Sequence, residues 1–394
     1  MPWMEESKVE QRLRFVMQVR QEGVSVAEAC REFDISRPTG YKWLRRYDED
    51  GLEGLEDQSR VPETIPHKTD EEVERLVCSL REQYPEFGPK KLRAWLSREH
   101  PDREWPAAST IGAILKRNGL VDKREVSKKS PPRTEPLAEA DAPNRIWSAD
   151  FKGQFELGDG SMCYPLTITD NHSRMILGCK ALPSTKGAAV RAYFEKVFER
   201  WGLPDAIRTD NGAPFASRAP RGLSMLSAWW ESLGIDHERT DPGKPQQNGR
   251  HERMHLTLKE YTARPAAQTM AAQQEAFDSF RVFFNQLRPH ESLGQTPPAD
   301  HHRQSERPLR DEPDDLTYPT CDLSRTVSHS GQIKMADERI YITEALRGHI
   351  VGLTEVEIGV WVVTFADKDL GYLESGETSM SAMQDQQSAK RMRI

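Results

Sequence analysis

The chain has 394 residues, of which 36% are hydrophobic and 30% are charged, and its formal net charge at pH 7 is −7. This composition excludes a wholly disordered chain, and at roughly 150 residues per domain the length predicts two to four domains. The negative charge argues mildly against a nucleic-acid partner, although such binding depends on where the basic residues cluster. No apolar run approaches the ~18 residues of a membrane span. The N-terminus lacks the basic start and apolar core of a signal peptide, so we expect a cytoplasmic protein.

The five cysteines are scattered along the chain and include no Cys-x-x-Cys pair. Neither a zinc site nor a disulfide framework is therefore expected. We interpret all five as buried apolar thiols: Cys30, Cys78, Cys163, Cys179 and Cys321.

Three short helices are expected in residues 1–60. The first covers 7–22 and ends at Gly23, the second covers 26–33, and the third follows Ser36, a good N-cap. The tight turn between the second and third helices gives the pattern of a helix-turn-helix DNA-binding domain. An ordinary helical bundle explains this stretch equally well. In the helix-turn-helix interpretation, the third helix presents four side chains to the major groove: Arg37, Thr39, Lys42 and Arg45.

A second helical unit is expected in residues 64–124. Its apolar residues recur at helical spacing, with a break at 84–89, a helix start at Pro106 and a C-cap at Gly119. Basic residues gather at its end and continue into a Pro-rich, charged linker at 125–143. Both a solvated linker and a segment that follows DNA phosphates fit this pattern. In the second interpretation, two residues of the last helix contact DNA: Lys116 and Arg117.

Residues 144–308 predict a mixed α/β domain. Three strands at 146–155, 162–170 and 173–182 are joined by tight turns, and helices and strands alternate after them. The later elements are expected at 188–201, 206–209, 223–233, 235–240, 246–261 and 268–287. Three consecutive strands followed by alternation indicate one sheet covered by helices.

The last part of the chain predicts a small all-β unit. Residues 325–375 carry short strand patterns, which we interpret as a small β-barrel of ~50 residues. Residues 376–394 have almost no core-forming pattern, so we expect a disordered tail.

Two aspartates occupy positions that are typical of a binding site. Asp150 lies on a predicted central strand, where a carboxylate is costly unless it is solvated, paired or bound to a metal ion. Asp210 ends another predicted strand, and ligand sites of open α/β sheets collect at such strand ends. Each aspartate alone is better explained as structural. Together the two aspartates favour a binding site.

The predicted helix 246–261 supplies a third carboxylate, Glu252. Its polar residues form one stripe that we expect to face the sheet edge or solvent: Asn248, Glu252, His255 and Lys259. Its apolar residues form a second stripe suited to packing on the sheet: Met254, Leu258 and Tyr261. A solvated charged face explains the other charged residues of this helix. For Glu252, a place beside the two aspartates is the better interpretation.

Four segments carry a family resemblance: Trp147–Gly153, Thr209–Phe215, Gln246–Arg253 and Asn285–Pro297. They resemble the integrase-type insertion-sequence transposases, the DDE transposases whose ribonuclease-H-like catalytic core is shared with retroviral integrases. The similarity also includes Phe87–Leu92 and the N-terminal helical units, so it covers nearly the whole chain. The four motifs are specific only in combination.

The spacing of the last two carboxylates departs from the family pattern. Between Asp210 and Glu252 lie 41 residues, which is longer than the usual spacing in integrases. We place the surplus in the loop 216–222, for which the sequence indicates no role.

The resemblance implies a metal-dependent DNA transposase with Asp150, Asp210 and Glu252 as both catalytic residues and metal ligands. Two Mg²⁺ or Mn²⁺ ions roughly 3.5–4 Å apart would assist water in nicking the element's ends and the freed 3′-hydroxyl in attacking target DNA. The implied partners are transposon ends, target DNA and further copies of the chain, in a nucleoid-associated complex. We expect His255 and Lys259 to contact DNA phosphates near this site.

Two other functions remain open at this point. One is a DNA-binding regulator that derives from a transposase and no longer catalyses, against which the intact set of three carboxylates counts. The other is a nuclease of the same fold without strand transfer.

Overall fold

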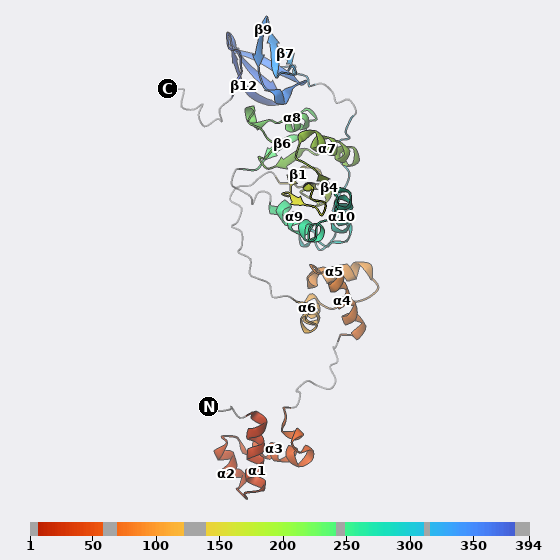
Figure 1. Cartoon of the computed structure of the whole chain (residues 1–394), viewed down its shortest axis with the longest axis vertical. Coiled ribbons are helices and arrows are strands. Elements are labelled where there is room, and N and C mark those ends of the chain that lie inside the picture. The colour runs from red at the N-terminus through yellow and green to blue at the C-terminus, as the bar shows by residue number, and fades with distance from the viewer. Residues whose placement is uncertain (1–6, 58–68, 122–138, 242–248, 311–315, 383–394) are drawn as a thin grey trace, which may run out of the picture. The chain divides into compact units, whose positions relative to one another are not determined.

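The computed structural model describes residues 7–57, 69–121, 139–241, 249–310 and 316–382 (Figure 1). The chain divides into two compact units, Met1–Asp70 and Glu71–Ile394. Within the described residues, every helix is too short or too polar to cross a membrane.

The first unit is a bundle of three helices, α1 (Lys8–Arg20), α2 (Val26–Glu32) and α3 (Arg37–Asp50). The side chain of Ser36 accepts a hydrogen bond from the backbone of Thr39, which confirms the predicted N-cap of α3. The apolar core of the bundle consists of Phe15, Val16, Ala29, Cys30, Trp43, Leu44 and Leu55.

The second unit begins with another three helices, α4 (Glu71–Gln83), α5 (Pro89–Glu99) and α6 (Ala108–Arg117). They enclose their own core and also contact the helix end that follows α10 (Met270–Val282), where Tyr84 stacks on Phe283 with ring centroids 5.6 Å apart. Two ion pairs connect the same parts of the chain: Lys90–Glu291 and Arg98–Asp300.

The central sheet contains β1 (Ile146–Phe151), β2 (Phe155–Glu156), β3 (Met162–Asp170), β4 (Ile176–Leu182), β5 (Ala206–Thr209) and β6 (Asp236–Arg239). Its order is β2-β3-β1-β5-β6, and β4 pairs with β3. The first expected strand is divided, because β1 ends at Phe151 and β2 begins at Phe155. The strand β1 runs antiparallel to β3 and parallel to β5, so the carboxyl ends of β1 and β5 lie at the same edge.

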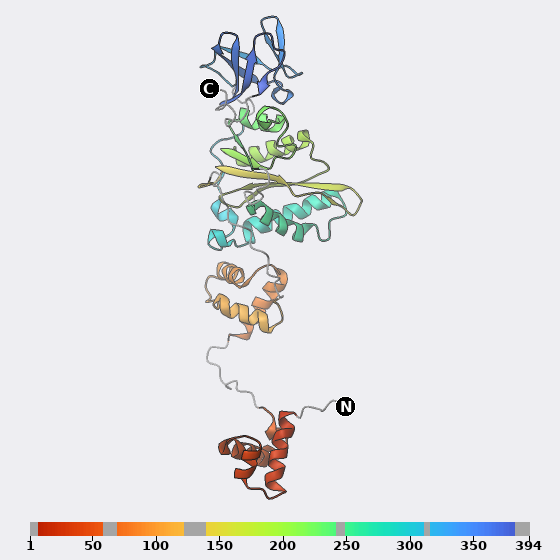
Figure 2. The same cartoon turned by 90° about the vertical axis from the view of Figure 1, so that its left-hand side faces the viewer.

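Helices cover both faces of this sheet (Figure 2). The helices α7 (Gly187–Trp201) and α8 (Met225–Ser232) pack with Trp147 and Ala149 of β1 in one core. The helices α9 (Gly249–Thr262) and α10 pack on the opposite face through Met254 and Phe277, against Cys179 and other residues of β3 and β4. Because side chains alternate along a strand, Asp150 points to the face that α9 covers.

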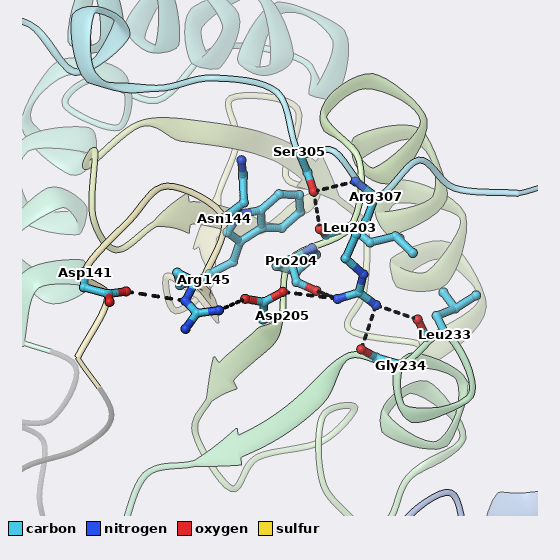
Figure 3. A network of polar contacts seen from close by, with 11 residues as sticks. Asp141, Asn144, Arg145, Leu203, Pro204, Asp205, Leu233, Gly234, Ser305 and Arg307 are labelled. Atoms are coloured by element: carbon cyan, nitrogen blue, oxygen red, sulfur yellow. Dashed lines mark hydrogen bonds and ion pairs between the residues drawn. The ribbon is translucent and has the colours of Figure 1, made fainter.

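The amino-terminal edge of the sheet is held by Arg307 (Figure 3). Its guanidinium donates hydrogen bonds to the backbone carbonyls of Pro204, Leu233 and Gly234, at 2.9, 3.0 and 2.7 Å. It also pairs with Asp205, which in turn accepts from Arg145 at 2.8 Å. This network ties the chain that leaves the domain to the loops before β5 and β6, at the edge opposite Asp150 and Asp210.

The expected C-terminal barrel is not confirmed. The described strands form two open sheets: a five-stranded sheet with the order β13-β12-β11-β10-β7, and the hairpin β8–β9. Their bounds are β7 Leu323–Thr326, β8 Gln332–Met335, β9 Glu338–Tyr341, β10 Ile350–Glu357, β11 Val360–Phe365, β12 Lys368–Glu374 and β13 Ser381–Ala382. The expectation of a tail from 376 onward is corrected for β13, which pairs with β12; residues 383–394 lie outside the described residues.

The loop 216–222 and α8 contact the C-terminal sheets. Leu223 and Ala228 share one buried apolar cluster with residues of β10 and β11, including Val351. The Arg221 guanidinium donates to the backbone carbonyl of Asp369 at 3.1 Å. The structure therefore gives this part of the chain a role that its sequence does not indicate, which is to hold the C-terminal strands on the central domain.

Candidate active site

Asp150 is the most buried of the three candidate carboxylates. Its side chain retains 20% of its exposure on β1. Its pKa is raised to about 7, first by burial and next by the negative charge of Asp210, with a smaller contribution from Glu252. Three elements thus bring negative charge to one place, and the electrostatic repulsion between these groups would be relieved by a bound cation.

Asp210 directly follows β5 and is exposed in a tight turn. One of its carboxylate oxygens accepts a hydrogen bond from the Gly212 backbone at 3.0 Å, and Asn211 donates to the Thr240 carbonyl at 2.6 Å. A Cβ atom at Gly212 would lie 3.1 Å from a carboxylate oxygen of Asp210, so glycine allows this close approach. The turn Asp210-Asn211-Gly212 therefore fixes the direction of the Asp210 side chain.

Glu252 and Lys259 are exposed on α9, as the predicted polar stripe requires. Asn248 of the same stripe lies outside the described residues. His255 does not belong to the exposed stripe, because it is only 2% exposed and faces the sheet. We therefore correct its expected position and do not propose it as a contact to DNA phosphates.

His251 and His255 form a buried polar group that the sequence interpretation missed. Both rings contact the Thr167 hydroxyl through Nε2, at 2.7 Å for His251 and 2.6 Å for His255. The Nδ1 atom of His251 lies 2.9 Å from the Thr169 hydroxyl, and Nδ1 of His255 lies 3.7 Å from Oδ2 of Asp150. Burial lowers the pKa of His251 to about 3 and also depresses the pKa of His255, so both rings are neutral at pH 7.

The donor set around Asp150 suits a hard divalent cation. One potential ligand atom from each of Asp150, His251 and His255 lies within 4.8 Å of the others. However, the nitrogens of His251 and Nε2 of His255 already contact threonine hydroxyls. Carboxylate oxygens are the ligands that Mg²⁺ and Mn²⁺ prefer. The neighbouring charges of Asp210 and Glu252 therefore make the carboxylates a better match than the imidazoles.

The side chains expected to contact DNA are mostly exposed. On α3, Arg37, Lys42 and Arg45 are exposed, whereas Thr39 is half-buried and its hydroxyl is 2.8 Å from that of Ser36. Tyr41, 60% exposed on the same helix, was missed because an aromatic residue at helical spacing usually indicates core. On α6, Lys116 and Arg117 are both exposed, and Arg117 forms an ion pair with Glu74.

Comparison with known protein families covers the helical units and the central domain. Two helix-turn-helix models match, a helix-turn-helix domain over residues 11–62 and a homeodomain-like domain over residues 39–115. Two integrase core domain models match residues 140–245 and 233–298.

Two proteins of insertion elements are similar to this chain. The IS476 uncharacterized 39.2 kDa protein of Xanthomonas euvesicatoria is 28% identical over 251 residues, which are 63% of this chain and 69% of that protein. The IS407 uncharacterized 31.7 kDa protein of Burkholderia multivorans is 27% identical over 240 residues, which are 59% and 82% of the two chains. The helix-turn-helix and integrase core models, together with these two relatives, support an integrase-type insertion-sequence transposase. Helix-turn-helix domains and an integrase core make it a DNA-binding polynucleotidyl transferase that acts in DNA transposition.

Viral proteins are also similar to this chain. The Gag-Pol polyprotein of gibbon ape leukemia virus is 25% identical over 226 residues, 55% of this chain but 12% of the polyprotein. Among solved structures, the HTLV-2 integrase catalytic core domain in complex with magnesium is 19% identical and matches with a TM-score of 0.34 over 42% of this chain and 100% of that one. A TM-score this low supports no argument about the present chain.

Proposed function

We propose that this transposase cleaves the ends of its mobile element and joins them to target DNA at a site formed by Asp150, Asp210 and Glu252. The observation that carries the proposal is that Asp150 and Asp210 lie at the carboxyl ends of the parallel strands β1 and β5, on the side of the sheet edge next to α9, which carries Glu252. Burial, and then the charges of Asp210 and Glu252, also raise the pKa of Asp150. Groups that act as acids, bases or metal ligands are often perturbed in this way. Helix-turn-helix domains in the same chain provide a means of holding the substrate DNA.

The three carboxylates would hold Mg²⁺ or Mn²⁺, as two ions. When bound, these ions supply Lewis-acid stabilisation of the attacking and leaving oxygens in an in-line displacement. The turn at Gly212 orients Asp210, and the sheet fixes the backbone of Asp150. Lys259, which is exposed on the same helix as Glu252, would bind a DNA phosphate near the site.

Recognition of the element's ends is assigned to the helical units. The exposed basic residues of α3, namely Arg37, Lys42 and Arg45, would enter the major groove, and Lys116 and Arg117 of α6 would contact phosphates. Two ends must be brought together for transposition, so we propose that the active complex contains more than one copy of the chain.

The test replaces each carboxylate by its neutral isostere, Asp150→Asn, Asp210→Asn and Glu252→Gln, in the full chain. End cleavage and strand transfer are measured on labelled terminal DNA with Mg²⁺, Mn²⁺ or excess chelator, and DNA binding is measured in parallel. Residues that act as one unit are not additive, so each single change should abolish nearly as much activity as all three together, while binding is retained.

Glu260→Gln is the matched control, because Glu260 is an exposed glutamate on the same helix as Glu252. Normal cleavage in a carboxylate variant would remove that residue from the site. Cleavage that persists in chelator would reject metal dependence. Binding without cleavage in the parent chain would indicate the regulator, and cleavage without joining would indicate the nuclease.

A further inference from the structure

The inner face of α3 packs closely on the other two helices of its unit. A Cβ atom at Gly40 would lie 2.5 Å from Cys30 Sγ and 2.9 Å from Phe15 Cζ, so only glycine allows this approach. Trp43 and Leu44 lie on the same face and are buried. Packing this close leaves α3 little freedom to rotate, so the side chains of its outer face are held in a fixed direction.

An exposed tyrosine lies on the outer face of α3. Tyr41 is 60% exposed and follows Arg37 and precedes Arg45 by one helical turn each, which places the three side chains in one row. The other tyrosine of this helix, Tyr47, packs against the apolar core of the unit, to which Tyr41 does not belong. Single exposed apolar residues are common on protein surfaces. What distinguishes Tyr41 is its place between two cations on the face proposed to enter the major groove.

The neighbouring row of α3 carries cations that are held against a buried ring. The Lys42 ammonium lies 4.8 Å and the Arg46 guanidinium 5.2 Å from the centroid of the Trp43 ring. The guanidinium of Arg12, on α1, lies 3.9 Å from the same centroid. The two rings on this part of the helix therefore differ, because Trp43 is covered by protein and cations whereas Tyr41 is open to solvent.

The chemistry of the major groove limits what an aromatic ring can bind there. The phosphates along its walls are anions, which suit cations and which the negative face of a ring does not attract. The base edges on its floor present hydrogen-bonding groups and one apolar group, the C5 methyl of thymine. A ring between Arg37 and Arg45 therefore complements a thymine methyl whose neighbouring phosphates or bases are bound by the two cations.

We propose that Tyr41 determines sequence specificity by contacting the C5 methyl group of a thymine in the terminal DNA. The inference rests on the proposed function, because it requires α3 to lie in the major groove at the element's ends. A tyrosine hydroxyl that donates to a phosphate would instead act on every DNA sequence, and a solvated ring would act on none. The three roles differ in whether they need the ring, the hydroxyl or neither.

The first experiment compares Tyr41→Ala with Tyr41→Phe in the full chain. Binding is measured by fluorescence anisotropy on terminal DNA and on a random duplex of the same length. We expect Tyr41→Ala to bind terminal DNA at least about 4-fold more weakly, the effect of roughly one buried methyl group, and to bind the random duplex as the parent does. Tyr41→Phe keeps the ring and should bind both DNAs as the parent does.

Tyr341→Ala is the matched control, because Tyr341 is also an exposed tyrosine but lies on β9, which is not assigned to recognition. Thermal unfolding checks the fold of each variant, and Tyr41→Ala should keep the parent Tm, since alanine favours a helix at an exposed position. Weaker binding of Tyr41→Phe to both DNAs would overturn the proposal in favour of a phosphate contact through the hydroxyl. Parent-like preference in Tyr41→Ala would overturn it in favour of a solvated ring.

The second experiment replaces the thymines of the terminal DNA by uracil, one position at a time, which removes only the C5 methyl group. At one position, uracil should weaken binding of the parent about 4-fold and leave binding of Tyr41→Ala unchanged, because both changes remove the same contact. If the parent prefers terminal DNA but no uracil position is coupled to Tyr41, this inference is overturned and end recognition stands. If the parent binds terminal and random DNA equally, the proposed end recognition is overturned, and this inference with it.

Discussion

At the scale of single residues, a half-buried histidine makes the stability of the domain depend on pH. His237 of β6 contacts the ring of Trp230, with centroids 5.5 Å apart, and its Nε2 lies 2.9 Å from the Thr209 hydroxyl. Burial, followed by the positive charges of Arg239 and Lys368, lowers its pKa from 6.5 to about 3. Between these two values the unfolded chain binds a proton that the folded chain does not. The contribution of His237 to the free energy of unfolding is therefore complete above pH 6.5 and is lost as the pH falls toward 3.

His237→Gln should reduce this pH dependence. In the parent chain, His237 alone contributes a slope of about 1.4 kcal/mol per pH unit in the interval between the two pKa values, and the variant loses this contribution. The measurement is the free energy of urea unfolding at several pH values from 7 downward. His329→Gln, at an exposed histidine, is the control and should keep the parent slope. An unchanged slope in His237→Gln would mean that this residue is not buried in its neutral form.

Some features of the candidate site can be predicted from the sequence and others cannot. Strand alternation alone puts Asp150 on the face opposite Trp147 and Ala149, as the structure has it, because that pattern is local. The orientation of His255 could not be predicted in this way. Its burial depends on the Thr167 hydroxyl, a partner 88 residues away in the chain. The i, i+4 spacing of His251 and His255 beside Met254 and Leu258 was the one local signal of a buried face.

At the scale of elements, helices with strong end signals were predicted well. Ser36 caps α3 as expected, and β3 and β5 have the predicted bounds. The sequence of β12 does not indicate a strand, because its buried residues, Leu370 and Leu373, do not alternate. A register shift between Val363 and Thr364 of the neighbouring strand accompanies this irregularity. Such a bulge depends on pairing with another strand, which the sequence of β12 alone does not indicate.

The helix α3 carries the exposed basic residues that we propose contact DNA. Arg37→Ala and Arg45→Ala each remove one exposed cation from the face proposed to enter the major groove. If each binds a phosphate, the slope of log K against log salt should become shallower by about 0.9 per variant. A residue that reads a base should instead reduce the preference for terminal over random DNA.

Fluorescence anisotropy of the full chain on both DNAs, across a salt series, measures both quantities. Lys8→Gln is the control, since Lys8 is an exposed cation at the start of α1. Variants that keep the parent slope and the parent preference would show that α3 does not contact DNA through these residues.

At the scale of the whole molecule, the sequence predicts helical units and a mixed α/β domain but does not indicate how these parts pack together. Short strand patterns predict β-structure without specifying whether a sheet closes, and here the C-terminal strands remain in open sheets. One of those sheets covers apolar residues of the central domain, so Leu223 and Ala228 belong to its core. The long spacing between Asp210 and Glu252 thus includes the segment that holds the C-terminal strands.

An ion pair between Lys368 and Glu231 connects the C-terminal sheet to α8. Glu231 of α8 is 7% exposed, and its carboxylate lies 2.9 Å from the Lys368 ammonium at the start of β12. Lys368→Met leaves a buried carboxylate without its partner, which typically costs about 3–5 kcal/mol, whereas replacing both members of such a pair by apolar residues is often neutral. We therefore expect Lys368→Met to lower Tm and to make the C-terminal sheets accessible to limited proteolysis.

The double variant Lys368→Met, Glu231→Leu should recover most of the parent Tm and most of the parent resistance to proteolysis, because no buried charge remains. Equal sensitivity of the single and double variants would show that the cost comes from lost packing. Parent-like behaviour of the single variant would show that this ion pair does not contribute to the attachment of the C-terminal sheets.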